Sequence, residues 1–136
     1  MIPVKSIECA RNLLEKADKP LYFFDSDPDG LTAFMQLHKF KEGPWVIKKS
    51  KPLLDASFLR KVEEYEPDLV VLLDIPLVEA EFIENVSCPI LWVDHHTPQT
   101  ELIDQYKHVF YLNPLEGRSP NNLPTAYWAY KIAPGH

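Results

Sequence analysis

The stretch Ile90-Leu91-Trp92-Val93-Asp94-His95-His96-Thr97-Pro98 runs from four apolar residues straight into an acid and two adjacent imidazoles. The apolar run predicts a strand that is buried on both faces, so the polar triplet stands where that strand ends. In α/β sheets this is the place where ligands bind. A carboxylate and two imidazoles are costly beside a core unless something binds them. From this stretch alone, an ordinary strand end with hydrogen-bonded surface histidines is an equally good interpretation.

Apolar strands alternate with amphipathic helices along the rest of the chain. The other expected strands are Leu21–Phe24, Trp45–Ile47, Leu69–Leu73 and Val109–Leu112. The expected helices cover residues 5–17, 31–38, 54–66, 82–86 and 125–132, with a polar loop over 115–122 and Pro124 in the first turn of the last helix. This order predicts a doubly wound, Rossmann-like α/β fold with a mainly parallel five-stranded sheet and helices on both faces.

The chain has 136 residues, enough for a single domain with one core. Its net charge of -6 argues against a generally basic nucleic-acid-binding surface. Local contact with nucleic acid stays open beside an ordinary solvated edge, because five cations lie close together in sequence: Lys48, Lys49, Lys51, Arg60 and Lys61. Four aromatic residues could stack on bases, although their helix and strand spacings favour core positions: Trp92, Trp128, Tyr127 and Tyr130.

Cysteine usage and hydropathy bear on the cellular compartment. Cys9 and Cys88 lie far apart and form no metal-ligand spacing, so we expect reduced, buried thiols. No apolar run approaches the ~20 residues of a membrane span. The segment Met1–Lys5 becomes charged early and lacks the apolar core of a signal peptide. These features predict a cytoplasmic protein with no membrane partner.

Three of the expected strands end in acids or histidines, and right-handed crossovers would place these ends at one edge of the sheet. Separately, Asp29 could cap the helix that follows it, and Asp74 could cap the next short helix. Together the strand ends bring up to five carboxylates and two imidazoles into one crevice, where like charges repel unless a cation lies between them. The residues concerned are Asp25, Asp27, Asp29, Asp74, Asp94, His95 and His96.

Carboxylates combined with imidazole suit Mn²⁺, and suit Mg²⁺ or Zn²⁺ less well. Because so many ligands exceed the needs of one ion, the sequence predicts two ions, roughly 3.5–4 Å apart, that share a carboxylate. Such a pair activates a bridging water near neutral pH and offsets the charge of a phosphate. The reaction class that this chemistry implies is hydrolysis of a phosphodiester or a phosphoanhydride.

The three acidic segments also resemble the motifs of a known family. The loop Asp25-Ser26-Asp27-Pro28-Asp29-Gly30 looks like the first motif of the DHH phosphoesterases, Leu72-Leu73-Asp74 looks like the second, and Val93-Asp94-His95-His96 looks like the third. Asn113-Pro114 and the helix after Pro124 resemble the segment that follows in RecJ-like members. The resemblance covers nearly the whole chain and implies a DHH domain over residues 1–136.

The resemblance implies a role for each of these residues, with Asp74, His95 and His96 closest to the catalysis. The implied assignment is Asp25 and Asp27 for one Mn²⁺, Asp29 and His95 for the other, Asp74 as the bridge, His96 for the substrate phosphate, and Asp94 to orient a neighbouring imidazole. Asp25 stands where many members have histidine and RecJ-like members have aspartate. The resemblance therefore implies a nuclease that acts on single-stranded DNA or RNA or on a short oligonucleotide.

One departure from the family concerns a fourth motif, an aspartate on the strand after the helix that ends near Ile132. The chain stops at His136, so we expect that ligand, and the second domain that normally closes over the crevice, to lie outside it. A C-terminal domain or a homo-oligomer could then complete the crevice.

Three other interpretations stay open. The main alternative is a DHH-fold scaffold subunit of a replication or repair complex that is catalytically weak or inactive. A haloacid-dehalogenase-like phosphatase would use Asp25 as its nucleophile and Asp27 as its acid, but it would leave His95 and His96 without a task. An inorganic pyrophosphatase of the same family is disfavoured, because Phe23 stands where that branch has histidine.

Overall fold

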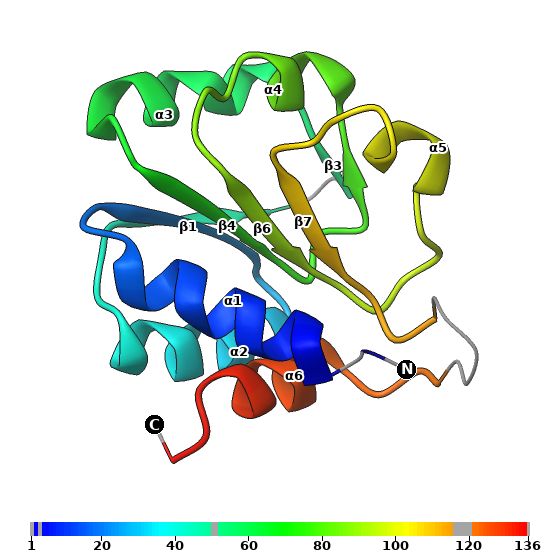
Figure 1. Cartoon of the computed structure of the whole chain (residues 1–136). Helices are drawn as coiled ribbons and strands as arrows, with labels where there is room; N and C mark the ends of the chain where they lie inside the picture. Colours follow the sequence, from blue (N-terminus) through cyan, green and yellow to red (C-terminus); the bar gives the residue numbers. More distant parts are fainter. Residues whose placement is uncertain (1, 3, 50–51, 116–120, 136) are drawn as a thin grey trace.

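A five-stranded sheet in which every neighbouring pair of strands is parallel forms the centre of the fold (Figure 1). The computed structural model describes residues 2, 4–49, 52–115 and 121–135. The strands are β1 (Pro20–Asp25), β2 (Trp45–Lys48), β4 (Leu69–Leu73), β6 (Ile90–Val93) and β7 (Val109–Leu112). Their order across the sheet is β2-β1-β4-β6-β7. The predicted sheet is confirmed, and it is wholly parallel rather than mainly so.

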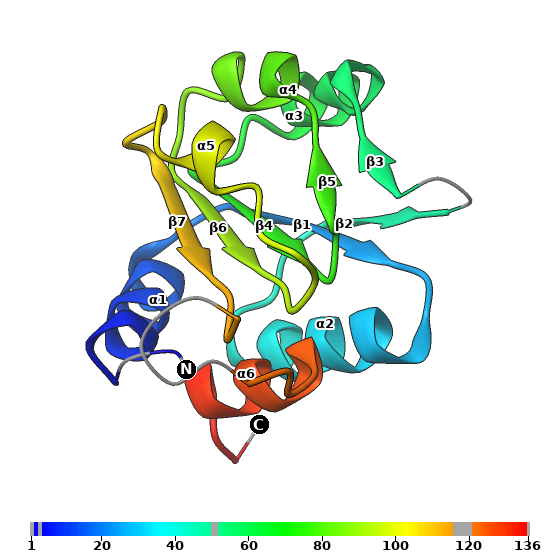
Figure 2. The ribbon, with the colours of Figure 1, turned by 90° about the vertical axis from the view of Figure 1, so that its right-hand side faces the viewer.

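Helices cover both faces of this sheet (Figure 1), and a view turned by 90° shows the same two layers (Figure 2). One face carries α1 (Val4–Lys16), α2 (Pro28–Phe40) and α6 (Thr125–Ile132), and the other carries α3 (Leu59–Tyr65), α4 (Ala80–Glu84) and α5 (Thr100–Ile103). Tyr22 and Phe24 belong to the first core, whereas Leu21 and Phe23 belong to the second. Because alternate residues of each strand are buried on opposite faces, the strands are apolar without interruption. The doubly wound prediction is confirmed.

The strand order determines where a ligand can bind. Counted along the chain, the five strands lie in the order 2-1-3-4-5, the flavodoxin-like arrangement, whose connections diverge to opposite faces between β1 and β4. In such sheets the crevice for ligands lies at this switch point, outside the carboxyl ends of the strands. β1 ends at Asp25, and Asp74 directly follows β4. Two of the expected acids therefore stand on either side of the switch point.

The shortest elements do not follow from the sequence pattern. β3 (Leu53–Leu54) and β5 (Leu77–Val78) form a separate parallel pair, and α5 has four residues. The helix expected over 54–66 is divided into a 3₁₀ turn, η1 (Ala56–Phe58), and α3. Strands of two residues, and helical segments of three or four residues, are too short to show a hydrophobic period, so the sequence pattern does not reveal them.

Two predictions, on the polar loop and on the basic cluster, fall partly outside the described residues. Residues 116–120 of the polar loop expected over 115–122 are not among the described residues, and neither is Lys51 of the basic cluster. Pro124 is the N-cap residue of α6 and therefore precedes the first turn that we expected it to occupy. The expectation of a solvated basic edge is wrong for Lys48, whose side chain is almost completely buried at the end of β2.

The aromatic and cysteine predictions are confirmed in part. Trp92 and Trp128 are buried, as expected of core residues. The core prediction is wrong for two tyrosines on the outer side of α6, which are exposed: Tyr127 and Tyr130. Both cysteines are free, but Cys9 is exposed and Cys88 is half-buried, so the expectation of buried thiols is wrong for Cys9. Within the described residues, no helix has the length and apolar character needed to cross a membrane.

Candidate metal centre

The first wall of the site is the tight loop between β1 and α2. Asp27 caps α2, because its Oδ1 accepts a hydrogen bond from the amide of Gly30 at 2.7 Å. Gly30 has to lack a side chain, since a Cβ there would lie 2.3 Å from the backbone oxygen of Asp25. This close approach holds the start of α2 against the end of β1. The carboxylates of Asp25 and Asp27 are thereby kept close to Asp74, with which they form a cluster.

Asp29 lies in the first turn of α2, but its carboxylate caps a different helix. Its Oδ2 accepts from the amide of Thr125 at 3.0 Å, and its Oδ1 accepts from the amide of Ala126 at 2.7 Å. Pro124, the N-cap residue of α6, has no side-chain oxygen to offer these amides. The alternative in which Asp29 caps its own helix is therefore wrong, and Asp29 instead ties α6 to α2.

Asp74 stands at the centre of the crevice, directly after β4. It has a φ of 60°, and its side chain is fully buried. Oδ1 accepts from the hydroxyl of Thr125 at 3.2 Å, whereas Oδ2 is buried without a hydrogen-bond partner among the described residues. The alternative in which Asp74 caps the next helix is wrong, because β5 intervenes and Glu79 is the N-cap residue of α4.

The electrostatic setting of Asp74 fits a divalent cation. Burial raises the pKa of Asp74 to about 9, with smaller contributions from a side-chain hydrogen bond with Asp27 and from the charges of Asp29, Asp27 and Asp94. A buried acid with this pKa keeps its proton at neutral pH, and a metal ion bound beside it would displace that proton. The unpartnered Oδ2 and the crowded carboxyls are both features that a bound cation would satisfy.

His95 is oriented as a metal ligand would be. Its Nε2 lies 3.2 Å from Oδ2 of Asp29 and 3.2 Å from Oδ1 of Asp74. On the other side of the ring, Nδ1 lies 3.1 Å from Oδ1 of Asn122. A proton on Nδ1 serves that amide oxygen and leaves the lone pair on Nε2. Because a lone pair facing two carboxylate oxygens needs a proton or a cation between them, this arrangement suits a metal ion.

His96 is held by a different acid. Its Nδ1 lies 2.6 Å from Oδ1 of the fully buried Asp94, whose Oδ2 accepts from the His96 amide at 3.1 Å. Asn113 fixes the same segment by donating from Nδ2 to the His96 carbonyl at 2.7 Å. With Nδ1 engaged, Nε2 is the nitrogen left for a ligand, and the side chain is 41% exposed. This is the contact that an orienting role for Asp94 requires.

The described residues contain two groups whose ligand atoms all lie within 4.8 Å of one another. One group comes from the ends of β1 and β4, and the other from the ends of β4 and β6. Asp74 belongs to both, so a cation held by either group would lie against its carboxylate. The groups are Asp25, Asp27 and Asp74, and Asp74, His95 and His96. Asp29 and Asp94 belong to neither, although both touch a histidine of the second group.

Three residues of the site were not predicted as site residues from the sequence. Asn122 and Thr125 contact the acids and His95 from the segment that leads into α6, and no motif in the sequence singles them out. Lys48 pairs with Asp25 in the register of β1 and β2. Burial lowers the pKa of Lys48, whereas the charges of Asp25 and Asp55 favour its protonated form. A buried cation thus stands beside the acidic loop, where the sequence suggested a solvated edge.

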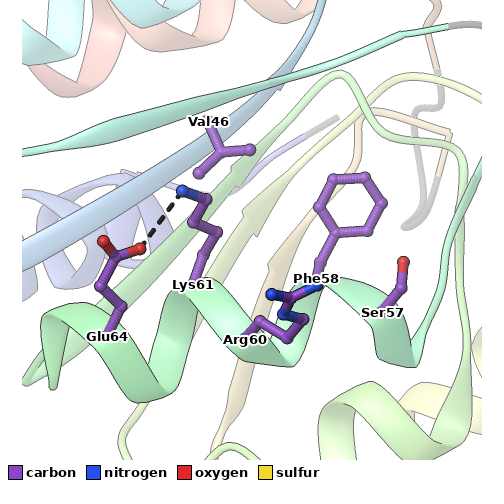
Figure 3. A pocket seen from close by; sticks show the side chains of 6 residues that line it. All are labelled: Val46, Ser57, Phe58, Arg60, Lys61 and Glu64. Atoms are coloured by element: carbon purple, nitrogen blue, oxygen red, sulfur yellow. Dashed lines mark hydrogen bonds and ion pairs between the residues drawn. The ribbon is translucent and has the colours of Figure 1, made fainter.

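Two hollows of the described surface differ in their relation to these side chains. One, of about 680 Å³, lies between β2 and α3 and contains none of the acids or histidines above (Figure 3). Its lining includes the Lys61–Glu64 ion pair, with 3.2 Å between Nζ and Oε2. The other, of about 460 Å³, is bordered by His95 and His96. The second hollow is therefore the one that adjoins the candidate chemistry.

No family sequence model and no curated protein sequence matches the chain. Its structure is similar to that of RecJ from Thermus thermophilus in complex with Mn²⁺, with 21% identity and a TM-score of 0.69 over 97% of this chain and 20% of that chain. A structure of exonuclease RecJ bound to manganese matches with 20% identity and a TM-score of 0.69 over 97% of this chain and 37% of that chain. At this identity the likeness shows a RecJ-like fold, and the chain spans a fifth to little more than a third of the two matched chains.

Proposed function

We propose that the chain is a phosphoesterase domain of the DHH family, of RecJ-like type, that uses Mn²⁺ or Mg²⁺ to hydrolyse phosphodiester bonds of single-stranded or short nucleic acid. The observation that carries the proposal is the position of Asp74, which is buried, has an unpartnered oxygen and belongs to both ligand groups. The likeness to two RecJ structures that contain manganese supports it.

In this proposal the crevice would hold two ions, and Asp74 would contribute to both. Asp25 and Asp27 would hold one ion, in line with the group that they form with Asp74. His95 and Asp29 would hold the other, in line with the two 3.2 Å contacts of His95 Nε2. Asp29 serves the ion and α6 together, because each carboxylate oxygen has two lone pairs and the amides of α6 use one on each.

When bound, the two ions would activate a shared water and offset the charge on the phosphate and on its leaving oxygen. The chain's own residues then position the substrate. Asp94 accepts from Nδ1 of His96, and a His96 ring that carries a proton on both nitrogens can donate the Nε2 N–H to a phosphate oxygen. The fully buried Asp74 and Asp94 lie in a low dielectric, where their interactions with a cation and with His96 are strengthened.

We also propose that residues 1–136 correspond to the metal-binding domain of a larger arrangement. The aligned region covers 20% of one matched chain and 37% of the other, which supports this assignment. A fourth acidic motif, and a second domain or a second copy of the chain, would then complete the crevice and grip the nucleic acid.

Calorimetric titration with Mn²⁺ tests the metal assignment, with two histidine variants as matched probes. His95→Ala should weaken Mn²⁺ binding by more than about tenfold. His96→Ala should leave Mn²⁺ binding nearly unchanged and impair the binding of inorganic phosphate to the Mn²⁺-loaded protein. An equal loss of Mn²⁺ affinity in both variants would contradict the separate roles. Release of mononucleotides from a labelled oligonucleotide, compared in Mn²⁺ and in EDTA, tests the reaction itself.

A non-catalytic scaffold subunit of a replication or repair complex is the second candidate. The observation in favour of this candidate is that two of the acids also have a structural role. Asp29 caps α6, and Asp74 accepts a hydrogen bond from Thr125. The scaffold interpretation predicts no heat of Mn²⁺ binding, no nucleotide release, and an Asp74→Asn variant that is more stable than the wild type whether or not Mn²⁺ is added.

A further inference from the structure

Beside the metal centre the crevice changes from acidic to apolar. The hollow of about 460 Å³ that borders His95 and His96 is within the size range of small-molecule sites. Four of its other lining residues are apolar and come from three separate segments: Pro52 before β3, Pro76 and Leu77 at β5, and Leu115 after β7. Polar atoms enter from Thr97 and Asn122.

Leu77 is presented to this hollow by a fixed backbone. In β5 the two residues alternate, so that Val78 is buried in the core and Leu77 is 39% exposed. The β5 backbone is anchored on both sides, because the Val78 amide donates to Oε1 of Gln99 at 3.0 Å and the Glu79 amide donates to the Leu54 carbonyl at 2.9 Å. A leucine held in this way offers apolar surface to a ligand without having to reorganise.

The two halves of the crevice select for a ligand with two kinds of surface. An inorganic phosphate or polyphosphate would gain from cations and from N–H donors, but it would gain nothing from Leu77 and two prolines. A nucleotide would gain from both, since its phosphate suits the side of His96 and its base has an apolar face. Asn122 connects the two halves, because it lines the hollow and contacts Nδ1 of His95.

From this juxtaposition we infer that the hollow holds the nucleoside next to the phosphate, with the base against Leu77, Pro76 and Pro52. The inference rests on the function proposed above and adds the position and the chemistry of the base subsite. The apolar part of the lining carries no pattern of donors and acceptors, so the subsite accepts different bases with similar affinity.

Calorimetry on the Mn²⁺-loaded protein with three ligands tests the inference: thymidine monophosphate, ribose 5-phosphate and inorganic phosphate. Thymidine monophosphate should bind roughly tenfold more tightly than the other two, as expected for one apolar group in a pocket. Leu77→Ser should remove this preference and keep phosphate binding, and Leu77→Met should restore it. Met35→Ser is the matched control, because Met35 is also an exposed apolar side chain but lies on α2, outside the hollow. The Met35→Ser protein should prefer thymidine monophosphate to the same extent as the wild type.

The outcomes separate this inference from the function on which it rests. Equal affinity for all three ligands, or a preference that survives in Leu77→Ser, would overturn the base subsite and leave the metal centre standing. If Mn²⁺ adds nothing to the affinity of any ligand and the nucleotide preference persists, the metal-dependent function is wrong and the subsite holds. If none of the ligands binds at millimolar concentration, both assignments are wrong.

Discussion

At the scale of single residues, Asp74 combines three features that each cost stability. Its φ of 60° is unusual for a residue other than glycine, its carboxyl is fully buried, and one of its oxygens has no partner among the described residues. Aspartate and asparagine tolerate this backbone region better than other side chains. Such a combination is found where a site, rather than the fold, determines the residue.

The first prediction concerns the pH dependence of stability in EDTA. The pKa of Asp74 is about 9 in the folded protein and near 3.8 in the unfolded chain, so the folded state holds this proton more tightly. The tighter binding of this proton contributes to the stability of the folded state, and the contribution is complete below about pH 4. It is lost as the pH rises toward 9, at up to about 1.4 kcal/mol per pH unit. Asp74→Asn keeps the backbone conformation and removes the titration.

Urea unfolding of both proteins at pH 5 and pH 8 measures this difference. The variant should gain in stability relative to the wild type as the pH rises, and the gain should vanish when Mn²⁺ is added to the wild type, because the cation takes the place of the proton. Parallel pH profiles for the two proteins would show that Asp74 does not hold a proton in the folded state.

The residues that carry charge could be predicted from the sequence, whereas their contacts could not. Strand ends rich in acids and imidazoles predict a cation site from the chemistry of those side chains alone. The cap that Asp29 provides joins residues that are 96 and 97 positions apart, and no local pattern encodes it. For the same reason the sequence suggested a surface position for Lys48, since its burial depends on neighbours outside its own strand.

At the scale of secondary structure, α6 depends on a side chain from another helix. The first amides of a helix have no partner within it, and Pro124 cannot supply one. Asp29 accepts from two of these amides, and its negative charge also interacts favourably with the positive end of the helix dipole. The start of α6, which carries Thr125 toward Asp74, is therefore positioned by α2.

The second prediction is that Asp29→Ala destabilises the protein in EDTA by roughly 1–3 kcal/mol, because two amides at the start of α6 lose a charged acceptor. Asp29→Asn should lie between this variant and the wild type, since the amide oxygen can still accept. Asp104→Ala is the matched control, because Asp104 is an exposed acid at the C-terminal end of α5 and not at the start of a helix. Urea unfolding measures all three variants, and an equal loss in Asp29→Ala and Asp104→Ala would argue against the cap.

Length explains which elements the sequence revealed. β1, β4, β6 and β7 contain unbroken apolar runs of four or more residues, and α1, α2 and α6 carry apolar stripes at helical spacing. Each of these elements lies near its expected position. β3 and β5 have two residues each, and they form because Leu53 and Leu77 meet in a parallel register that neither segment specifies by itself. Leu77, which lines the hollow beside His96, lies in β5, and Pro52 and Pro76 directly precede β3 and β5, so this part of the wall could not be foreseen.

At the scale of the whole molecule, the parallel order of the strands brings the side chains of the candidate site together. All five strands are parallel, so the residues that follow β1, β4 and β6 meet at one edge although they come from positions 25 to 96. Alternating apolar strands and helices were sufficient to predict this convergence. The closing of the crevice by α6 was not predictable, since it depends on the caps and hydroxyl contacts described above.

The last prediction follows from ligands that belong to three strand ends. The amides of Ser26, Asp74 and Asp94 each donate to the neighbouring strand, at 3.2, 2.9 and 3.1 Å. Two bound Mn²⁺ ions would link these strand ends to one another. Mn²⁺ at 100 times its dissociation constant should therefore slow local opening at all three ends by up to ~100-fold, or about 2.7 kcal/mol.

Hydrogen exchange read by mass spectrometry on peptides around these amides measures the effect. The amides of Val70 and Ile90 serve as an internal control, because they donate hydrogen bonds at the amino ends of β4 and β6, away from the metal ligands. Their exchange rates should change less. Asp74→Asn should remove the Mn²⁺ effect at all three strand ends together, since the bridge is shared. Slowing confined to the peptide around Ser26 would mean that a cation binds the acidic loop alone, and that β4 and β6 do not contribute ligands to one centre.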